Sequence, residues 1–419
     1  MIDFINNFNF LLFLTIAILY FYQGVYMVLS MVGKAKRLRA TKNNRYAVII
    51  PARNEEKVIP HLIDSLKRQN YPAELLDVFV IADNCTDRTA AVCRAAGARV
   101  YERFNKRYVG KGYALHEFFK VFDEKYGFEA YDGYFLFDAD NLADENYVKE
   151  MNAYFDNGFR IVTGYRSSKN FGDTWVSAGS GTWFLRDCVF MHRPRMMCHT
   201  TANITGTGFL MSAEIVRKNG GWKHFLLTED IEFSVDMVLQ DEVIGFAERA
   251  IYYDEQPLRF RESWTQRMRW VKGFYQVLRK YGLRLVKRAF IDGSFGNYDM
   301  FMLVAPGNIL AWITILVNLI FFFIGVFDVS ASTEVMAATA QSLLGLLRNV
   351  FLVFMAVGAA TTIREWRRIP AKPARKLLNI LTFPIYMISY IPISLIAVWK
   401  KVKWVPIEHS EAMDISEIK

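Results

Sequence analysis

Two aspartates end an apolar run in the first half of this 419-residue chain. The run is "GYFLFDAD" (133–140), and it places Asp138 and Asp140 one residue apart at the end of a predicted strand. Carboxylates with this spacing can bind one divalent cation, and sites with only oxygen ligands favour Mg²⁺ or Mn²⁺. Because a bare D-x-D pattern is common, the position after a strand is what indicates a metal site.

A second acidic pair follows the apolar residues of "FLLTEDIEFS" (225–234). Either Glu229 or Asp230 can serve as a general base, provided that burial or the neighbouring acid raises its pKa. The alternative is structural, because acidic residues are also favoured in the first turn of a helix.

Three further stretches have residues suited to binding a nucleotide. In "VIADNCTD" (80–87), Asp83 and Asp87 can accept hydrogen bonds from a nucleobase or ribose, although an Asx turn or helix cap is equally consistent. "VGKGYAL" (109–115) sets Lys111 between two glycines, so its ammonium and the backbone can approach a phosphate, although the stretch is not a Walker motif. "NITGTGFLMS" (203–212) provides a flexible turn where backbone can approach a ligand.

Cations and an indole are concentrated in "TQRMRWVKG" (265–273). Arg267, Arg269 and Lys272 surround Trp270 there. The wider segment 259–298 mixes basic and aromatic residues, a composition typical of amphipathic helices in a membrane interface. One interpretation of the motif is therefore a membrane-surface helix without a catalytic role.

The elements that must position these residues alternate between strand and helix. Apolar runs at 46–52, 76–83, 133–140 and 160–165 are separated by helical patterns, which predicts an α/β domain over 46–298 with a mostly parallel, Rossmann-like sheet. Each run ends in polar residues, at the sheet edge where open α/β sheets bind ligands.

The composition indicates a soluble domain joined to membrane segments. Hydrophobic residues make up 53% of the chain, yet 22% is charged and the net charge is +9. Residues 9–32 have no charge and are long enough to cross a bilayer, and a basic stretch follows from residue 34. The positive-inside rule then places the N-terminus outside and the α/β domain in the cytosol.

Long apolar segments return at 299–327, 336–361 and 377–399. The basic loop 364–376 is expected in the cytosol, which two crossings before it satisfy. The last segment has Pro384 and Pro392 and precedes more lysines, so a crossing and a re-entrant or in-plane segment are both open. We favour the crossing. Much of the surplus charge flanks the membrane, which argues against a nucleic-acid partner.

The order of these motifs resembles that of the family-two inverting glycosyltransferases. "VIIPARNEE", "VIADNCTD", "GKG", "FDAD", "GTG", "TED" and "QRMRW" follow one another as in that family, over about residues 46–275. The final Q-x-x-R-W resembles the mark of the processive membrane synthases that make cellulose, chitin and hyaluronan. The first acidic motif departs slightly, because it reads "ADNCTD" rather than paired aspartates.

The resemblance implies a GT-A-type fold and a role for each matching residue. Asp230 is expected as the catalytic base beside Glu229, and Asp140 as the ligand of Mg²⁺ or Mn²⁺. Substrate binding is expected from Arg53, Glu55, Asp83, Lys111, Asp138, Gly206, Thr207, Gln266, Arg269 and Trp270.

The implied function is processive, inverting synthesis of a β-linked polysaccharide, with the growing chain passed across the plasma membrane. "QRMRWVKG" is closer to the cellulose type, which favours UDP-glucose and a β-glucan over a synthase that uses UDP-N-acetylglucosamine. A non-processive transferase with a lipid acceptor and a transporter or scaffold with a decayed transferase domain are the alternatives. Partners expected are the UDP-sugar, the growing polysaccharide, the bilayer, and accessory export proteins or a second copy.

The predicted boundaries follow from these segments. They are an N-terminal transmembrane helix (1–33), a cytosolic GT-A domain (34–258), interfacial amphipathic helices with Q-x-x-R-W (259–298), about three transmembrane helices (299–400) and a tail (401–419). Aromatic and amide residues in the apolar segments are candidates to line a path for carbohydrate: Asn308, Trp312, Asn318, Trp366, Tyr386 and Tyr390.

Overall fold

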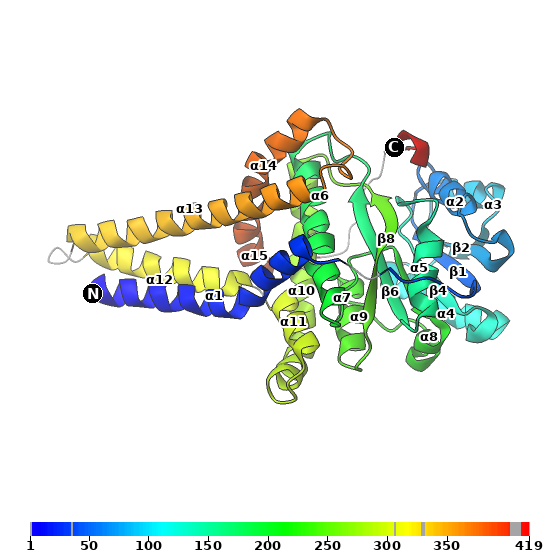
Figure 1. Ribbon diagram of the computed structural model, residues 1–419, viewed down its shortest axis with the longest axis horizontal. Helices are drawn as coiled ribbons and strands as arrows, with labels where there is room; N and C mark the ends of the chain where they lie inside the picture. The colour runs from blue at the N-terminus through cyan, green and yellow to red at the C-terminus, as the bar shows by residue number, and fades with distance from the viewer. Residues whose placement is uncertain (1, 35–36, 306, 328–331, 403–411, 419) are drawn as a thin grey trace.

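An eight-stranded sheet forms the centre of the α/β domain (Figure 1). The computed structural model describes residues 2–34, 37–305, 307–327, 332–402 and 412–418. The strand order is β3-β2-β1-β4-β7-β6-β8-β5. Strands β1 (Tyr46–Ala52), β2 (Leu76–Asp83), β3 (Arg99–Arg103) and β4 (Gly133–Leu136) are parallel.

The second half of the sheet is mixed. Strand β7 (Phe209–Ser212) is antiparallel to both β4 and β6 (Ile161–Ser168), whereas β8 (Ile244–Asp254) is parallel to β6. The two-residue strand β5 (Leu142–Ala143) pairs antiparallel with β8. The predicted Rossmann-like, mostly parallel sheet is confirmed, with β7 as the antiparallel strand that links its halves.

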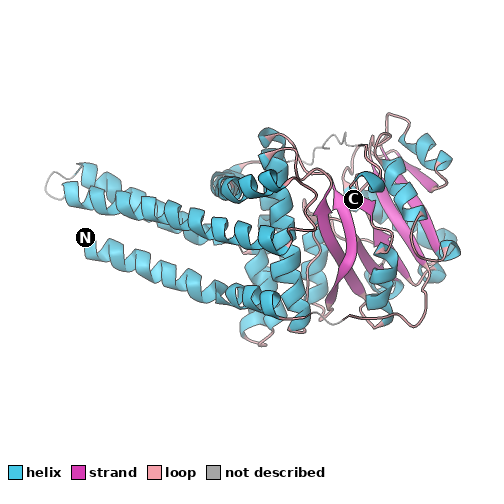
Figure 2. Ribbon diagram, turned by 45° about the horizontal axis from the view of Figure 1, so that its top comes forward, coloured by secondary structure: helices cyan, strands magenta, loops and turns pink. Residues whose placement is uncertain are grey.

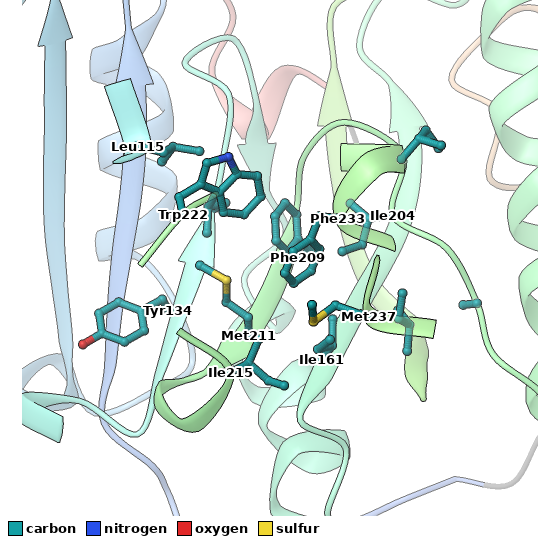
Figure 3. Packing of buried hydrophobic residues seen from close by; sticks show 14 of the residues in the cluster. Leu115, Tyr134, Ile161, Ile204, Phe209, Met211, Ile215, Trp222, Phe233 and Met237 are labelled. Carbon is teal, nitrogen blue, oxygen red and sulfur yellow. The ribbon is translucent and has the colours of Figure 1, made fainter. Parts of the chain in front are cut away.

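Helices cover both faces of the sheet, which explains why β1 is apolar at nearly every position. One face is packed by α2 (Ile59–Lys67), α3 (Thr89–Ala95) and α5 (Tyr147–Asp156). The other is packed by α4 (Lys111–Tyr126), α8 (Ala213–Asn219) and α9 (Glu229–Val238). Figure 3 shows this second core, where Trp222 and Phe233 are stacked beside Phe209. The same core fixes α9, which begins with the acidic pair.

Further helices join the central sheet to the apolar segments. They are α6 (Trp175–Asp187), α7 (Arg193–Met197), the 31-residue α10 (Phe260–Phe290) and α11 (Phe295–Val304), with a π-helical turn at Cys188–His192 between α6 and α7. Single 3-10 turns occur at Ala73–Leu75, Phe128–Ala130 and Ile415–Glu417. The predicted interfacial segment 259–298 is thus mainly one long helix.

Three long helices extend away from the α/β domain (Figures 1 and 2). They are α1 (Ile2–Val32), α12 (Gly307–Phe327) and α13 (Ser332–Arg364). Helices α14 (Pro373–Ile388) and α15 (Tyr390–Trp399) run across their direction, beside α6 and α10. By length and composition, Ile2–Val32, Thr333–Arg364 and Pro373–Trp399 could each cross a membrane, and Trp312–Phe327 is a shorter apolar helix.

A buried ion pair anchors α1 to the rest of the molecule. Arg195 donates from Nε and Nη2 to the two carboxylate oxygens of Asp299, both at 2.7 Å, and both side chains are buried. Tyr22 and Tyr26 of α1 donate to the same carboxylate at 3.1 and 3.4 Å. Burying the two charges of this pair costs desolvation energy, which these hydrogen bonds offset. The hydrogen bonds therefore hold α1, α7 and α11 in one arrangement.

Candidate active site

Lys111 brings three of the predicted motifs together. Its Nζ donates to Asp138 Oδ1 at 2.7 Å and to the carbonyl of Gly206 at 2.8 Å, and it lies 3.7 Å from Glu229 Oε1. Burial opposes its charge, but the carboxylates of Asp138 and Glu229 outweigh burial and raise the pKa of Lys111. The lysine is therefore a buried cation among the carboxylates.

Glycine at position 112 allows this placement. Lys111 is the first residue of α4, and a Cβ on Gly112 would lie 2.3 Å from the carbonyl oxygen of His224. Any larger residue would push α4 away from the segment that leads to the acidic pair. The second glycine of "GKG" thus serves the close packing of α4 against this segment.

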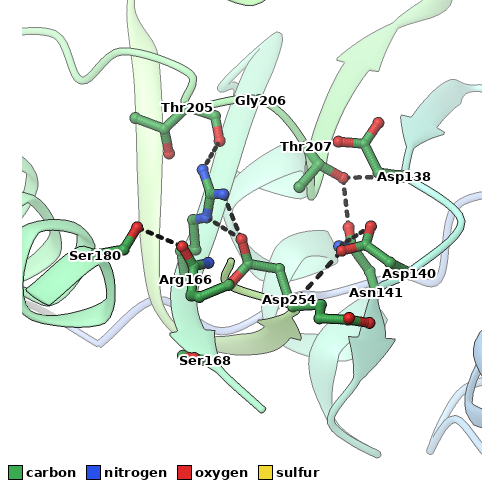
Figure 4. A network of polar contacts seen from close by, with 12 residues as sticks. Asp138, Asp140, Asn141, Arg166, Ser168, Ser180, Thr205, Gly206, Thr207 and Asp254 are labelled. Atoms are coloured by element: carbon green, nitrogen blue, oxygen red, sulfur yellow. Dashed lines mark hydrogen bonds and ion pairs between the residues drawn. The ribbon is translucent and has the colours of Figure 1, made fainter. Parts of the chain in front are cut away.

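The 205–207 loop contacts both acidic motifs, and Figure 4 shows its contacts with the D-x-D loop. The Gly206 N–H donates to Asp230 Oδ2 at 2.6 Å. Thr207 Oγ1 accepts from the Asp138 N–H at 2.7 Å and donates to Asn141 Oδ1 at 2.5 Å. One short turn therefore orients Asp230 and the D-x-D loop relative to each other.

Burial makes Glu229 and Asp230 weaker acids than exposed carboxyls. Burial raises the pKa of Glu229 to about 7, with Lys111 opposing the rise and Asp230 adding to it. Burial also raises the pKa of Asp230, against the charge of Lys111 and the hydrogen bonds from the Ile231 and Gly206 N–H groups. A carboxylate with a raised pKa is a better general base near neutral pH.

The raised pKa of Glu229 predicts a pH-dependent loss of stability that Glu229→Gln removes. Between pH 4.5 and about 7 the unfolded chain ionises this group while the folded chain keeps the proton, so the wild type loses stability as the pH rises. Above pH 7 the loss of folding stability is complete and is on the order of 3 kcal/mol. Below the ordinary pKa of a glutamate carboxyl there is no loss.

Thermal unfolding of the ligand-free protein in detergent from pH 4.5 to 8 measures this difference. The variant's melting temperature should exceed that of the wild type by a margin that grows across the range. Glu214→Gln, at an exposed glutamate outside the site, is the matched control and should run parallel to the wild type. Parallel curves for Glu229→Gln would contradict the raised pKa.

Asp140 lies on the same loop as Asp138 and is almost fully buried. Its carboxylate accepts from Asn141 Nδ2 and from the Glu255 N–H, both at 3.2 Å (Figure 4). Within the described ranges, no three His, Cys, Asp or Glu side chains are grouped as a metal site. Two carboxylates still suit Mg²⁺ or Mn²⁺, because such ions are commonly completed by water and substrate phosphate.

The first two strands place the remaining predicted donor-side residues. Asp83 accepts from Arg103 Nη1 at 2.6 Å and from Asn84 Nδ2 at 2.9 Å. Burial raises the pKa of Asp83, and the positive charges of Arg103 and Arg53 oppose the rise. Arg53 therefore lies near Asp83, as the order of strand ends predicts.

Two other polar residues in this region have local structural partners. The Glu55 N–H donates to Thr89 Oγ1 at 2.8 Å. Asp87 accepts from the Thr89 N–H and Oγ1 at 3.0 and 2.6 Å and from the Glu56 N–H at 3.2 Å. For Asp87, these contacts match the turn interpretation rather than nucleotide binding.

Of the Q-x-x-R-W residues of α10, Arg269 faces the segment that leads to the acidic pair. Arg269 Nη1 is 3.5 Å from the carbonyl of Leu227, and its charge opposes the rise in the pKa of Glu229 that burial causes. The Oε1 atom of Gln266 is buried and has no hydrogen-bond partner among the described residues. Trp270 contacts Phe184 edge-to-face at 5.8 Å.

Comparison with known proteins identifies the family of this chain. Residues 43–273, more than half of the chain, match the family model described as "Glycosyltransferase like family 2". The chain belongs to this glycosyltransferase family. The match spans all seven motifs, from "VIIPARNEE" to "QRMRW".

Several relatives are similar over part of their length. The "Probable glycosyltransferase YdaM" of Bacillus subtilis (strain 168) is 26% identical over 290 residues, which cover 66% of this chain and 67% of that protein. The "Beta-monoglucosyldiacylglycerol synthase" of Synechocystis sp. is 25% identical over 235 residues, 55% of this chain and 47% of that protein. The chain thus spans about half the length of this second relative.

A solved structure has the same fold along nearly the whole chain. The mannosyltransferase PcManGT from Pyrobaculum calidifontis, in complex with GDP-Man and Mn²⁺, superposes with a TM-score of 0.55 at 15% identity. The superposition covers 95% of this chain and 99% of the other. At this identity the likeness concerns the fold of the glycosyltransferase, including its helical part.

Two residues that the sequence analysis missed, Arg166 and Asp254, lie beside the candidate site. Arg166 donates from Nε to Asp254 Oδ2 and from Nη1 to the Thr205 carbonyl, both at 2.7 Å, and its guanidinium lies 3.5 Å from the ring centroid of Phe184 (Figure 4). Trp270, Phe184, Arg166 and the 205–207 loop are thus linked by consecutive contacts. Asp254 ends the strand-like run "AIYYD", so the strand-end rule used for Asp138 could have found it.

Gly273, at the end of the "TQRMRWVKG" motif, sets the distance between α10 and the acidic motif. A Cβ at this position would lie 2.4 Å from Thr228 Oγ1 and 2.5 Å from its Cγ2. Gly273→Ala should therefore displace α10, destabilise the protein by about 1–3 kcal/mol, and lower turnover more than donor binding. Melting temperature, initial rate and donor titration measure the three effects.

Gly282 of the same helix is the matched control. A Cβ there meets only the flexible Leu278 side chain, at 3.0 Å. Gly282→Ala should leave activity unchanged and, because alanine favours helix, gain up to about 1 kcal/mol. Equal behaviour of the two variants would contradict the role given to Gly273.

Proposed function

We propose that this glycosyltransferase moves a hexose, with inversion, from a nucleotide-diphosphate sugar to an acceptor hydroxyl at the cytosolic face of the plasma membrane. The observation that carries the proposal is the grouping around Asp230. That carboxylate is oriented by the Gly206 N–H and lies beside the buried cation Lys111, and the charge of Arg269 acts on the neighbouring Glu229. A base next to cations suits attack on a sugar whose leaving group is anionic.

In the proposed reaction, Asp230 accepts the proton of the acceptor hydroxyl as its oxygen attacks the anomeric carbon. The bond from that carbon to the diphosphate breaks on the opposite side, so an α-linked donor gives a β-linked product. Lys111 and Arg269 stabilise the diphosphate charge that develops, and the guanidinium can form forked hydrogen bonds. A divalent cation held by Asp140 and Asp138 would supply further positive charge to the leaving group.

Divalent cation use by this chain is supported by the two carboxylates and by Mn²⁺ in the PcManGT complex. We expect EDTA to abolish transfer and added Mn²⁺ or Mg²⁺ to restore it. The rate of nucleotide release, measured before and after dialysis against metal-free buffer, checks this. Full activity in metal-free buffer would contradict it.

The donor base is proposed to be uracil. Asp83 is held by Arg103 as an acceptor, and a carboxylate can accept the ring N–H of uracil. Guanine also has a ring N–H, and PcManGT was solved with GDP-Man, so GDP-sugars belong in the test. The likeness of "QRMRWVKG" to the cellulose type favours glucose over N-acetylglucosamine.

The acceptor is proposed to be the end of a growing β-glucan. Trp270 offers an indole face to the C–H side of a pyranose, at the end of the row of contacts that leads from the 205–207 loop. Repeated addition at this position is processive synthesis. The acceptor would remain bound while UDP is exchanged.

Export of such a chain would need helices from a second copy or an accessory protein. The candidate lining residues mostly bond or pack with other helices: Asn318 with Asn9, Trp312 Nε1 with Ser394 Oγ, and both Tyr386 and Tyr390 with Arg267. Trp366 accepts from Lys376 through its carbonyl. The side chain of Asn308 lies outside the described residues.

These helix contacts favour a second candidate, transfer to a membrane lipid without polymerisation. A lipid acceptor needs no path through the helices, because its hydroxyl already lies at the membrane surface. The relative from Synechocystis is named as a synthase of a glucosylated diacylglycerol. Product length separates the two candidates.

Purified protein in lipid nanodiscs should be incubated with UDP-glucose, UDP-N-acetylglucosamine, UDP-galactose or GDP-mannose and Mn²⁺. We expect nucleotide release to be fastest with UDP-glucose. A product that resists solvent extraction and is cut by a β-glucanase supports the glucan, whereas a solvent-extractable monoglycosyl lipid supports the second candidate. Release with none of the donors would overturn both.

A further inference from the structure

The chain on either side of the C-terminal apolar segment 373–399 contacts the α/β domain. Before the segment, Glu365 accepts from the Tyr165 hydroxyl of β6 at 2.7 Å, and the Arg368 guanidinium lies 4.7 Å from the centroid of that Tyr165 ring. Beyond its end, Asp414 pairs with Arg68, just after α2, at 3.2 Å. A single crossing would separate these two ends by the full bilayer.

Although the whole segment is long enough to cross, it is divided near Ser389 into two helices that are each short for a crossing. Helix α14 has 16 residues and α15 has 10, so they are about 24 Å and 15 Å long, against a hydrocarbon core of about 30 Å. Pro392 lacks the N–H that would continue the helical ladder to Ile388, which explains the break near Ser389. Figure 1 shows both helices running across the direction of α1, α12 and α13.

The polarity of α14 is reversed relative to a helix that faces water. Lys376 and Asn379 are on its buried side, where Asn379 Nδ2 donates to Thr182 Oγ1 of α6 at 2.6 Å. Leu377, Leu381 and Ile385 are 57%, 56% and 53% exposed. An exposed row of large aliphatic side chains, adjoining helices that are long enough to cross, fits lipid as its surroundings.

Helix α10 supplies two cations that cap these helices. Arg267 is fully buried and donates from Nη1 to the Tyr386 carbonyl at 3.1 Å and to Ser389 Oγ at 2.6 Å, at the C-terminus of α14. Lys272 donates to the carbonyls of Ala397 and Val398 at 2.9 and 3.1 Å, at the C-terminus of α15. Both charges lie where the helix dipole is negative, which compensates the buried guanidinium.

From these contacts we propose that α14 and α15 lie in the membrane surface on the side of the α/β domain, as an in-plane clamp on α10, and do not cross. The exposed face of both helices contacts the lipid leaflet on the side of the α/β domain. Basic residues flank both ends of the segment and suit anionic headgroups: Arg364, Arg367, Arg368, Lys372, Arg375, Lys400 and Lys401. This arrangement replaces the crossing favoured from sequence by the in-plane alternative.

Nitroxide depth measurements in liposomes of phosphatidylcholine and phosphatidylglycerol test the proposal. Single cysteines are introduced into a Cys85→Ser, Cys198→Ser background, and collision with oxygen and with a water-soluble nickel chelate reports the depth of each label. The labelled positions are all exposed residues: Leu377, Leu381, Ile385 and Ile396, with Leu316 of α12 as the deep control and Glu129 as the aqueous control.

We expect the first four positions to have one similar, shallow depth between the two controls. Depth that reaches the bilayer centre along 377–396 would overturn the proposal, and so would collision rates equal to those at Glu129. A second measurement labels Ser416→Cys with an impermeant maleimide in sealed, oriented vesicles. Labelling from the same side as Glu129→Cys supports the in-plane arrangement, and labelling from the opposite side overturns it.

Discussion

Asp230→Asn should lower turnover by about 10²- to 10⁴-fold and leave the dissociation constant of the donor within about twofold. The amide oxygen of asparagine can still accept from the Gly206 N–H, which lies 2.6 Å from Asp230 Oδ2, so the loop keeps its position. What the variant loses is the basic carboxylate that receives the acceptor's proton. Initial rates of nucleotide release and calorimetric titration with UDP measure the two quantities separately.

Glu229→Gln is the comparison that assigns the base. Glu229 contacts Lys111 at 3.7 Å, but the Gly206 N–H is bonded to Asp230. We therefore expect Glu229→Gln to retain more turnover than Asp230→Asn, and Asp241→Asn, just beyond the same helix, to retain all of it. Near-normal turnover of Asp230→Asn would place the base elsewhere, and loss of UDP binding would mean that the substitution disturbs the donor side.

The sheet could be predicted where strands are buried on both faces. The predicted runs 46–52 and 76–83 coincide with β1 and β2, because continuous apolar residues leave no other stable environment. Strand β3 was missed because its sequence "RVYER" belongs to a partly exposed edge strand. Strand β8 was missed because Glu248 and Arg249 interrupt it near a register shift opposite Gly164 and Tyr165.

The apolar helices were harder to divide from sequence. The predicted segment 299–327 is two helices, α11 and α12, and 377–399 belongs to α14 and α15. Hydropathy measures whether a segment is apolar, and it does not distinguish a helix that crosses from one that lies along the surface. Prolines are the local signal for such breaks. In the sequence, Pro306 lies between the ranges of α11 and α12, and Pro392 lies close to the junction of α14 and α15.

Within the candidate site, motif order predicted which residues meet but not what supports them. Lys111, Asp138, Gly206 and Glu229 are neighbours, as their strand-end and helix-start positions suggest. The Arg166–Asp254 pair joins β6 to β8, residues 88 positions apart, and no local pattern specifies such a partner. The same holds for the two cations of α10 that cap α14 and α15.

Arg269→Met should lower turnover by about 10²- to 10³-fold, because it removes a preorganised cation from the developing diphosphate charge. Arg269 Nη1 lies 3.5 Å from the carbonyl of Leu227, just before the acidic pair, and its charge opposes the rise in the pKa of Glu229 that burial causes. Arg269→Lys should recover only part of the loss, since an ammonium cannot form the forked hydrogen bonds of a guanidinium. Rates at saturating donor concentration for the wild type, Arg269→Lys and Arg269→Met should fall in that order. UDP binding is measured in parallel.

The other arginines of α10 separate a catalytic contribution from a general effect of charge. Arg279 is exposed on the same helix, so Arg279→Met should leave both rate and melting temperature unchanged. Arg267→Met removes the cap of α14 and should mainly lower the melting temperature, because Arg267 bonds to the Tyr386 carbonyl and Ser389. If Arg269→Met instead lowered the melting temperature as Arg267→Met does, with turnover preserved in the folded fraction, its role would be structural. The diphosphate would then have Lys111 and the D-x-D cation as its charged partners.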